Sequence, residues 1–492
     1  MRICLYTEHD HYGVAVDRPA HSVAGIVPAP AARLEPDAIG ITQDIVISLA
    51  STAPAVSVAV TIATLVAATA YGSVPSLLIC AVPMIIMANA YRKLNMWNVN
   101  CGVSFEWVGR SISPYLGFLM GWMLLASATI GTAATVDVLG PSVLAVFNAP
   151  AANKWWNCVI AIALVLAMLI IAAMGIRLTA RTQVGMAIVE YAILIVFAIW
   201  GLSAVLGHHA GTMPITRNWF SVHGISGKGS LAGGMLAAVF MYSGWEGSLY
   251  VNEESKRRSV NPGRAAIMAT IILAALYCLA TLGLQGVVSG KVLQNAPSPL
   301  IAIAQALGGG YWAKVMALAI ALSTIATVGT IILIMARVTY AMAGRRVLPD
   351  VLGGVSPRFR TPVVATAVCG GLLLVVSCLY LLVTSLYQAF TDAVDVTADL
   401  VILMYGITTL ATIVYYRRRV FTGIRNLLTL GILPFGAVAF LGWVFWKQVA
   451  TATVAQKWTL IGIIGVGVLA MLASRAFMRS PFYRMPLDSD KP

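Results

Sequence analysis

The sequence has 492 residues, of which 59% are hydrophobic and 10% are charged, and its mean hydropathy is +0.86. So few charges cannot cover a soluble globule of this length, which excludes the soluble and disordered classes and indicates a polytopic membrane protein. The net charge of +14 would suit a nucleic-acid-binding protein, but the basic residues gather in alternate loops between apolar stretches. We therefore expect the lipid bilayer, and no nucleic acid, as a partner.

About twelve stretches are apolar and long enough to cross a bilayer as helices of roughly 20 residues. Lys and Arg are concentrated in every second loop, which the positive-inside rule places in the cytoplasm. An even number of spans then puts both termini in the cytoplasm, and we expect a multi-pass protein of the plasma (inner) membrane. The predicted spans lie near residues 45–66, 74–93, 113–139, 154–175, 183–206, 230–252, 264–288, 311–342, 362–385, 392–416, 427–447 and 457–477.

The first span is interrupted near its middle. Pro54 has no backbone donor and disfavours helical geometry at the preceding residue, yet a proline suits the first turn of a new half-helix. The exposed N–H groups of that half-helix, at the positive end of its dipole, would bind an anion such as an amino-acid carboxylate. A simple proline kink is the alternative. The predicted binding residues here are Ser51, Thr52, Ala53 and Ala55.

The sixth span carries polar residues at 243–246 inside an apolar run of membrane-crossing length. Lipid cannot hydrogen-bond a loosened backbone, so a Ser-Gly break and a carboxylate at this depth have to face protein or a watery cavity. We predict a broken helix whose carbonyl end binds an ammonium group. Its aromatic residues would gate the solute, with plain packing as the alternative, and Glu246 would sense protons, pair with a cationic solute or hold the break. The predicted binding residues are Phe240, Tyr242, Ser243, Gly244, Trp245 and Glu246.

Glu190 is the one charged residue of the predicted fifth span. Burial disfavours the charged form of a carboxylate unless a cation or several donors hold it ionised. Glu190 would therefore take up a proton with the solute and release it on the other side; a structural hydrogen bond to a neighbouring helix is the alternative. In the eighth span, the adjacent hydroxyls of Ser323 and Thr324 offer a sodium-like site, although hydroxyls in a span more often bond back to their own helix.

Neither a metal site nor a cofactor is expected. The six histidines lie outside the predicted spans and the sequence has no Cys-x-x-Cys pair, so the spans offer few soft ligands to a metal. An intramembrane enzyme would need a nucleophile–base pair or a His/Asp cluster within the spans, and the same distribution argues against it. ATP drive is not expected either, because the spacing of a phosphate-binding loop is missing.

Three further stretches carry residues at characteristic spacings: the region of helices 2 and 3, the broken sixth span with the acidic pair that follows it, and the segment after helix 8. These residues are Gly102, Phe105, Trp107, Arg110, Pro114, Gly117, Gly121 and Trp122; Phe240, Tyr242, Gly244, Trp245, Glu246, Glu253 and Glu254; and Arg337, Tyr340, Ala341, Met342, Ala343, Leu348, Pro349, Val355, Arg358, Thr361 and Pro362. In these stretches the sequence resembles the amino acid–polyamine–organocation (APC) superfamily of transporters. The likeness covers nearly the whole chain from about residue 40.

The resemblance implies an all-α fold with a five-plus-five inverted repeat, in which broken helices 1 and 6 hold the solute and access alternates around it. The chain departs from the family pattern at Glu190, where many proton-coupled relatives carry a lysine, and at 51–54, which replace a glycine-rich break. The implied division is a cytoplasmic N-terminal tail (1–38), a first repeat (39–206), an external loop (207–229), a second repeat (230–416), two extra helices (417–478) and a cytoplasmic C-terminal tail (479–492).

Together these features predict a secondary active transporter, and not an enzyme, that moves amino acids or small amines across the plasma membrane. A proton or a counter-substrate would be the coupling partner, so that the protein works by proton symport or by exchange. A sodium-coupled symporter of the same substrates is one alternative. The other is a nutrient sensor on the same scaffold, which would bind the solute without moving it.

Overall fold

The computed structural model describes residues 33–69, 71–149, 154–221, 231–382 and 387–488. Contacts divide the chain into two units, Met1–Ala31 and Ala32–Pro492, and all of these residues belong to the second. Most of the predicted N-terminal tail (1–38), part of the predicted external loop (207–229) and the last residues of the predicted C-terminal tail lie outside the described residues.

Helices make up almost all of the described chain, and its only extended pairing is an isolated parallel bridge between Ile39 and Ser255. The helices of the first half are α1 (Ile41–Ser51), α2 (Pro54–Thr69), α3 (Ser73–Trp97), α4 (Ser104–Ser111), α5 (Pro114–Asp137), α6 (Leu139–Val146), α7 (Lys154–Ala173) and α8 (Ile176–Leu206). Those of the second half are α9 (Leu231–Tyr242), α10 (Asn261–Leu284), α11 (Gly290–Asn295), α12 (Pro299–Gly308), α13 (Gly310–Gly344), α14 (Val363–Leu382), α15 (Tyr387–Tyr415), α16 (Arg417–Val420), α17 (Ile424–Asn426), α18 (Leu433–Thr451) and α19 (Val454–Met478).

Eleven helices in the described ranges are long and apolar enough to cross a membrane, so the protein is an all-α multi-pass membrane protein, as predicted. The predicted sixth span is not among them because α9 ends at Tyr242. The chain resumes as a 3₁₀ helix, Gly247–Glu254, after a short non-helical turn. The described chain therefore has eleven candidate spans rather than the predicted number of about twelve because the sixth span is broken, as predicted.

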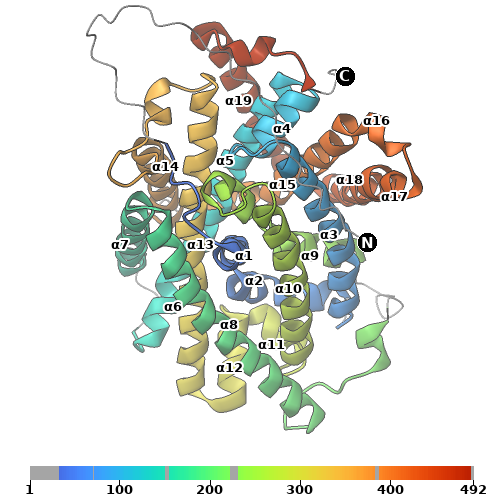
Figure 1. The fold of residues 1–492 in the computed structure, drawn as a ribbon. Helices are drawn as coiled ribbons and strands as arrows, with labels where there is room; N and C mark the ends of the chain where they lie inside the picture. The colour runs from blue at the N-terminus through green and yellow to red at the C-terminus, as the bar shows by residue number, and fades with distance from the viewer. Residues whose placement is uncertain (1–32, 70, 150–153, 222–230, 383–386, 489–492) are drawn as a thin grey trace, which may run out of the picture. The chain divides into compact units, whose positions relative to one another are not determined.

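The first interrupted span does not share the lipid-facing position of the last helices. The apolar stretch of Ile41–Thr69 is 83% buried within the protein, whereas that of α19 is 22% buried. Figure 1 shows α1 and α2 in the midst of α8, α10 and α13. Since lipid offers no hydrogen bonds, a broken helix is stable only where other helices replace the lipid. The fold supplies that surrounding for the first break.

Candidate functional site

The first span breaks between α1 and α2. Helix α1 ends at Ser51, and Ala53 adopts a left-handed conformation with φ of 49°, which is strained for a residue with a Cβ. Pro54 then starts α2 without a backbone donor. The carbonyl of Ala50, released by this turn, accepts bonds from Ala53 N at 3.3 Å and from Thr327 Oγ1 of α13 at 2.9 Å. The turn is therefore held from outside its own helix.

The first amides of α2 are occupied by side chains of two other helices. Ala55 N donates to Glu190 Oε1 of α8 at 3.0 Å, and Val56 N donates to Ser323 Oγ of α13 at 3.5 Å. Glu190 is 1% exposed and so places its own carboxylate at the positive end of α2. These are the amides that the sequence suggested for a substrate carboxylate. The structure places Glu190 there instead, and Ala55 does not line the cavity between the two breaks.

The second break follows α9 and rests directly on the first. Gly244 has φ of 106°, which glycine adopts without strain. A Cβ on this residue would lie 2.6 Å from the carbonyl oxygen of Ser51, so a side chain does not fit. Ser51 Oγ donates to the Gly244 carbonyl at 2.5 Å. The two interrupted spans, distant in sequence, thus meet backbone to backbone.

Tyr405 of α15 ties the second break together. Its hydroxyl donates to the Glu246 carboxylate and accepts a bond from Gly244 N at 2.9 Å. Glu246 is 4% exposed and Tyr405 is fully buried. Tyr405 was not among the residues that the sequence indicated, and the signal available there was a phenol in the middle of an apolar span. It fixes the position of the carboxylate that faces the cavity.

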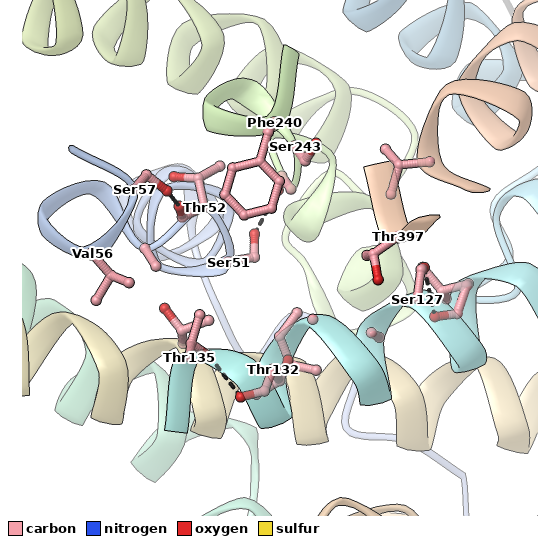
Figure 2. Close-up of a pocket in the computed structure, with 18 of the residues that line it drawn as sticks. Ser51, Thr52, Val56, Ser57, Ser127, Thr132, Thr135, Phe240, Ser243 and Thr397 are labelled. Carbon is pink, nitrogen blue, oxygen red and sulfur yellow. Dashed lines mark hydrogen bonds between the residues drawn. The ribbon is translucent and has the colours of Figure 1, made fainter. Parts of the chain in front are cut away.

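A cavity of about 140 Å³ lies between the two breaks and α5. Figure 2 shows Ser51, Thr52 and Phe240 on one side of it and Thr132 and Thr135 of α5 opposite. The volume is well below the roughly 300–1,000 Å³ of pockets for drug-sized ligands, so it suits a small solute. The predicted residues that line it are Ser51, Thr52, Ala53, Phe240, Ser243, Gly244 and Glu246; residues that the sequence did not indicate include Ser127, Thr132, Thr135, Thr327, Thr397 and Tyr405.

The polar groups of the cavity act mainly as hydrogen-bond acceptors. Each of seven lining hydroxyls donates its hydrogen to a main-chain carbonyl, which leaves oxygen lone pairs for a ligand. Glu246 adds a carboxylate, while the lining drawn from the described residues contains no Lys, Arg or His. The cavity therefore favours a positively charged or hydrogen-donating group. The seven hydroxyls belong to Ser51, Thr52, Ser57, Ser127, Thr135, Ser243 and Thr327.

Two of the predicted gating residues lie away from the cavity. Tyr242 donates its hydroxyl to the carbonyl of Leu77 at 3.2 Å and packs edge-on against Tyr277. Trp245 is fully buried and packs against Tyr91, with ring centroids 5.0 Å apart. Both side chains support the helices around the break. Of the three aromatic residues, Phe240 lines the cavity.

The two hydroxyls of the predicted sodium-like site point in different directions. Ser323 Oγ reaches the start of α2, where it accepts the bond from Val56 N. Thr324 Oγ1 donates to the carbonyl of Ile320, one turn back on its own helix, at 3.0 Å. Thr327, one turn further along α13, bonds instead to the Ala50 carbonyl released by the first break. Ser323 and Thr327, rather than Ser323 and Thr324, therefore form the contact of α13 with the broken helix.

Two buried polar contacts lie near the start of α1. Arg337 Nε and Nη2 donate to the two Glu254 oxygens, each at 3.0 Å, and both side chains are fully buried. Ser255 Oγ donates to Asp44 Oδ1 at 2.7 Å. Asp44 lies seven residues before Ser51, or about 10 Å along a helix. One buried ion pair and one buried hydrogen bond thus lie on the side of the cavity where α1 begins.

Known proteins are similar in sequence to this chain. A family model described as amino acid permease matches residues 44–470. The sequence is 25% identical to the Asc-type amino acid transporter 1 of Homo sapiens over 231 residues, which are 46% of this chain and 42% of the relative. It is 24% identical to a low-affinity putrescine importer of Escherichia coli (strain K12) over 302 residues, or 60% of this chain and 64% of the relative.

A third relative is an arginine/ornithine antiporter of Lactococcus lactis, with 24% identity over 275 residues, or 51% of each chain. The chain therefore matches between about two fifths and two thirds of the length of these curated relatives. All three are named as transporters of amino acids or amines.

Proposed function

This chain belongs to the amino acid permease family, and from that membership we propose that it is a secondary active transporter of amino acids or small amines. The solute would bind between the two interrupted spans, and access would alternate between the two faces of the plasma membrane around that site. Each break lies in the first span of one of two inverted repeats that we propose, residues 39–206 and 230–416. Proton symport or exchange would supply the driving force.

The observation that supports this proposal is the cavity at the meeting point of the two breaks. Residues 51–53 at the first break, residues 243–244 at the second break and Glu246 all line it. Main-chain groups freed from a helix in mid-membrane are costly unless they serve a solute path or are otherwise satisfied. We further propose that the buried pair of Arg337 and Glu254 closes one face of the site, as alternating access requires in one of its two states.

The polarity of the cavity bears on the chemical class of the substrate. An ammonium group would find acceptors at Glu246, at the hydroxyl oxygens and at the carbonyl end of α1. A carboxylate would find few donors, because Ala55 N and Val56 N already bond to Glu190 and Ser323. We therefore propose that recognition centres on the amine, in small amines or in the ammonium end of an amino acid. The putrescine importer among the relatives is in keeping with this class.

Glu190 is the proposed coupling residue, with Glu246 as a second acid. The charged form of Glu190 accepts a bond from the Ala55 amide at the positive end of α2, and a proton on Glu190 would remove that charge and weaken its hold on the break. Protonation and the position of the half-helix would thereby be linked. A bound ammonium group would favour the ionised form of Glu246, since an opposite charge nearby stabilises a carboxylate. Binding of the solute and protonation of Glu246 would thereby be linked.

Uptake by the purified protein in proteoliposomes tests these proposals. Labelled putrescine, arginine and alanine would be offered under an inside-alkaline pH gradient, under a sodium gradient, or against unlabelled substrate inside the vesicles. We expect accumulation of an amine-bearing substrate in the first or third condition. Accumulation only with sodium would favour a sodium-coupled symporter. Saturable binding without uptake in any condition would favour a sensor and contradict the transport proposal.

The orientation is also a proposal. The excess of Lys and Arg places both termini, and the closed face beside Glu254, in the cytoplasm. Labelling of single cysteines introduced at Lys256 and at Lys457, in intact cells with a membrane-impermeant maleimide, tests this. Only the Lys457 position should react from outside.

A further inference from the structure

Two adjoining hollows lie where α13 and α19 end, and arginines line both. The first, of about 550 Å³, is lined by 344–346 and by the chain that follows α19. The second, of about 270 Å³, lies beside Tyr115. Arg479 and Arg484 belong to both linings, so the two form one continuous recess. We call this recess, with Arg346, Arg475, Arg479 and Arg484, the arginine pocket.

The pocket is built by specific contacts of the segment after α19. Ser480 Oγ donates to the carbonyl of Arg345 at 2.5 Å, and Ser474 Oγ donates to that of Val347 at 2.7 Å. Phe482 stacks on Phe105, with ring centroids 4.8 Å apart. A Cβ at Gly109 would lie 2.6 Å from the Phe482 ring, so glycine leaves room for it. These contacts hold the arginines of three segments around one recess.

Among the described residues, ion pairs do not offset the charge of the four pocket arginines. Arg345 and Arg110, at its edge, pair with Glu106, and Arg110 also pairs with Asp488 at 2.5 Å. Within the described ranges no carboxylate lies within ion-pair distance of the four pocket arginines, which are exposed to solvent. Four like charges around one recess repel each other. Guanidinium groups in such a cluster recognise phosphate through paired N–H donors.

The pocket also adjoins an apolar surface. On the last turns of α19, Leu469 is 67% exposed, Leu472 is 49% exposed and Phe477 is 82% exposed. Side chains of this kind at the end of a membrane span contact acyl chains. A ligand with a phosphate group and acyl chains would satisfy both parts of the surface. We propose that the arginine pocket binds the headgroup of an anionic phospholipid and thereby fixes the ends of α13 and α19 to each other.

Thermal unfolding of the full-length protein in a non-ionic detergent tests this site. The probes are phosphatidylglycerol, cardiolipin, phosphatidylcholine and inorganic phosphate. We expect saturable stabilisation by the anionic lipids and little by phosphatidylcholine, since a ligand that binds the folded state raises the midpoint. If inorganic phosphate stabilises as strongly as the lipids at equal concentration, the site takes a soluble phosphate and the lipid assignment is overturned.

A triple variant, Arg346→Gln/Arg479→Gln/Arg484→Gln, separates the pocket from general surface charge. Each arginine near an anionic lipid contributes about fivefold to affinity, so the loss should be about 100-fold. The matched control is Lys256→Gln/Arg257→Gln/Arg258→Gln, which removes the same charge from an exposed stretch that lies outside the pocket. Equal losses in the two variants, or no loss in the first, would overturn the proposal.

If the triple glutamine variant does not fold, two other variants still test the proposal. Arg484→Gln alone removes one exposed side chain and should lower lipid affinity about fivefold. The triple replacement by lysine keeps the charge but loses the paired donors, and should bind anionic lipid more weakly than the native protein and more tightly than the glutamine variant. An unchanged affinity in Arg484→Gln contradicts the assignment.

Discussion

The carboxylate of Glu190 accepts a hydrogen bond from the backbone N–H of Ala55 at 3.0 Å, across 135 residues of sequence. A buried acid of one span thus caps the second half of another, at the place where the first span is broken. Because the cap is itself titratable, the protonation state of one side chain is linked to the stability of the break. In this site the Ala55 amide is already bonded to Glu190, so it is not free to bind the carboxylate of a substrate.

Glu190→Gln should abolish uptake driven by a pH gradient while leaving substrate binding within about threefold of the native value. The amide oxygen of Gln still accepts the Ala55 bond, but the side chain no longer exchanges a proton. Uptake in proteoliposomes with and without an inside-alkaline gradient measures the effect. Glu253→Gln is the matched control, since Glu253 also accepts one backbone bond, from Cys101 N at 3.0 Å, outside the cavity. Undiminished pH-driven uptake by Glu190→Gln removes the coupling role.

Tyr405→Phe should weaken binding of the amine substrate by about 1–3 kcal/mol, or about 5- to 150-fold. The change deletes the hydroxyl that positions Glu246 and leaves Gly244 N without its partner. Direct binding of the substrate identified by the uptake screen measures the loss. Tyr416→Phe serves as control, because its hydroxyl donates to the carbonyl of Lys93 at 3.0 Å, away from the cavity. Similar losses for both variants would show that Tyr405 acts only on the fold.

Gly244→Ala should reduce transport far more than it reduces expression of the protein. The added Cβ would lie 2.6 Å from the Ser51 carbonyl oxygen and would force the two breaks apart. Residue 244 also has φ of 106°, which alanine adopts only with strain. Gly371→Ala in α14 is the control, because a Cβ there has no neighbour within 4 Å and alanine favours a helix by about 0.5–1 kcal/mol. Uptake rates normalised to folded protein decide the matter. Native rates in Gly244→Ala would mean that the contact of the breaks is dispensable.

Arg337→Gln should lower the unfolding free energy by about 3–5 kcal/mol, since it leaves the buried Glu254 charge without its partner. The comparison is Arg177→Gln, whose pair with Glu35 is exposed and should contribute about 0–1 kcal/mol. Denaturant titration of the two variants in detergent gives the difference. Equal effects would contradict the view that Arg337 and Glu254 close this face of the protein.

The same variant should also open the closed face. Cys101 is fully buried, and its thiol donates to the Arg337 carbonyl at 3.4 Å. We expect faster modification of Cys101 by a permeant maleimide in Arg337→Gln than in the native protein, measured by peptide mass spectrometry. An unchanged rate of Cys101 modification would show that the Arg337–Glu254 pair stabilises the fold without closing this face.

The class of fold and the positions of the spans could be predicted from the order of the residues alone. Hydropathy over about 20 residues reports whether a segment prefers lipid to water, and this preference is a local property of the chain. The two breaks could be located for the same reason, because Pro54 and the Ser-Gly pair at 243–244 act on the backbone where they stand. Glu190 and Glu246 were conspicuous because a carboxylate in a span is costly.

Which side chains meet in the cavity could not be predicted in this way, because it depends on how the helices pack. Tyr242 and Trp245 are close to Phe240 in sequence, but the rotation of α9 and its following turn directs Phe240 to the cavity and the other two toward neighbouring helices. Tyr405 and Thr327 join the site from α15 and α13, and Glu190 accepts the bond from the Ala55 amide of α2. Such contacts depend on how apolar helices of similar hydropathy pack, and that is set by the shapes of all neighbours together rather than by any one stretch of sequence.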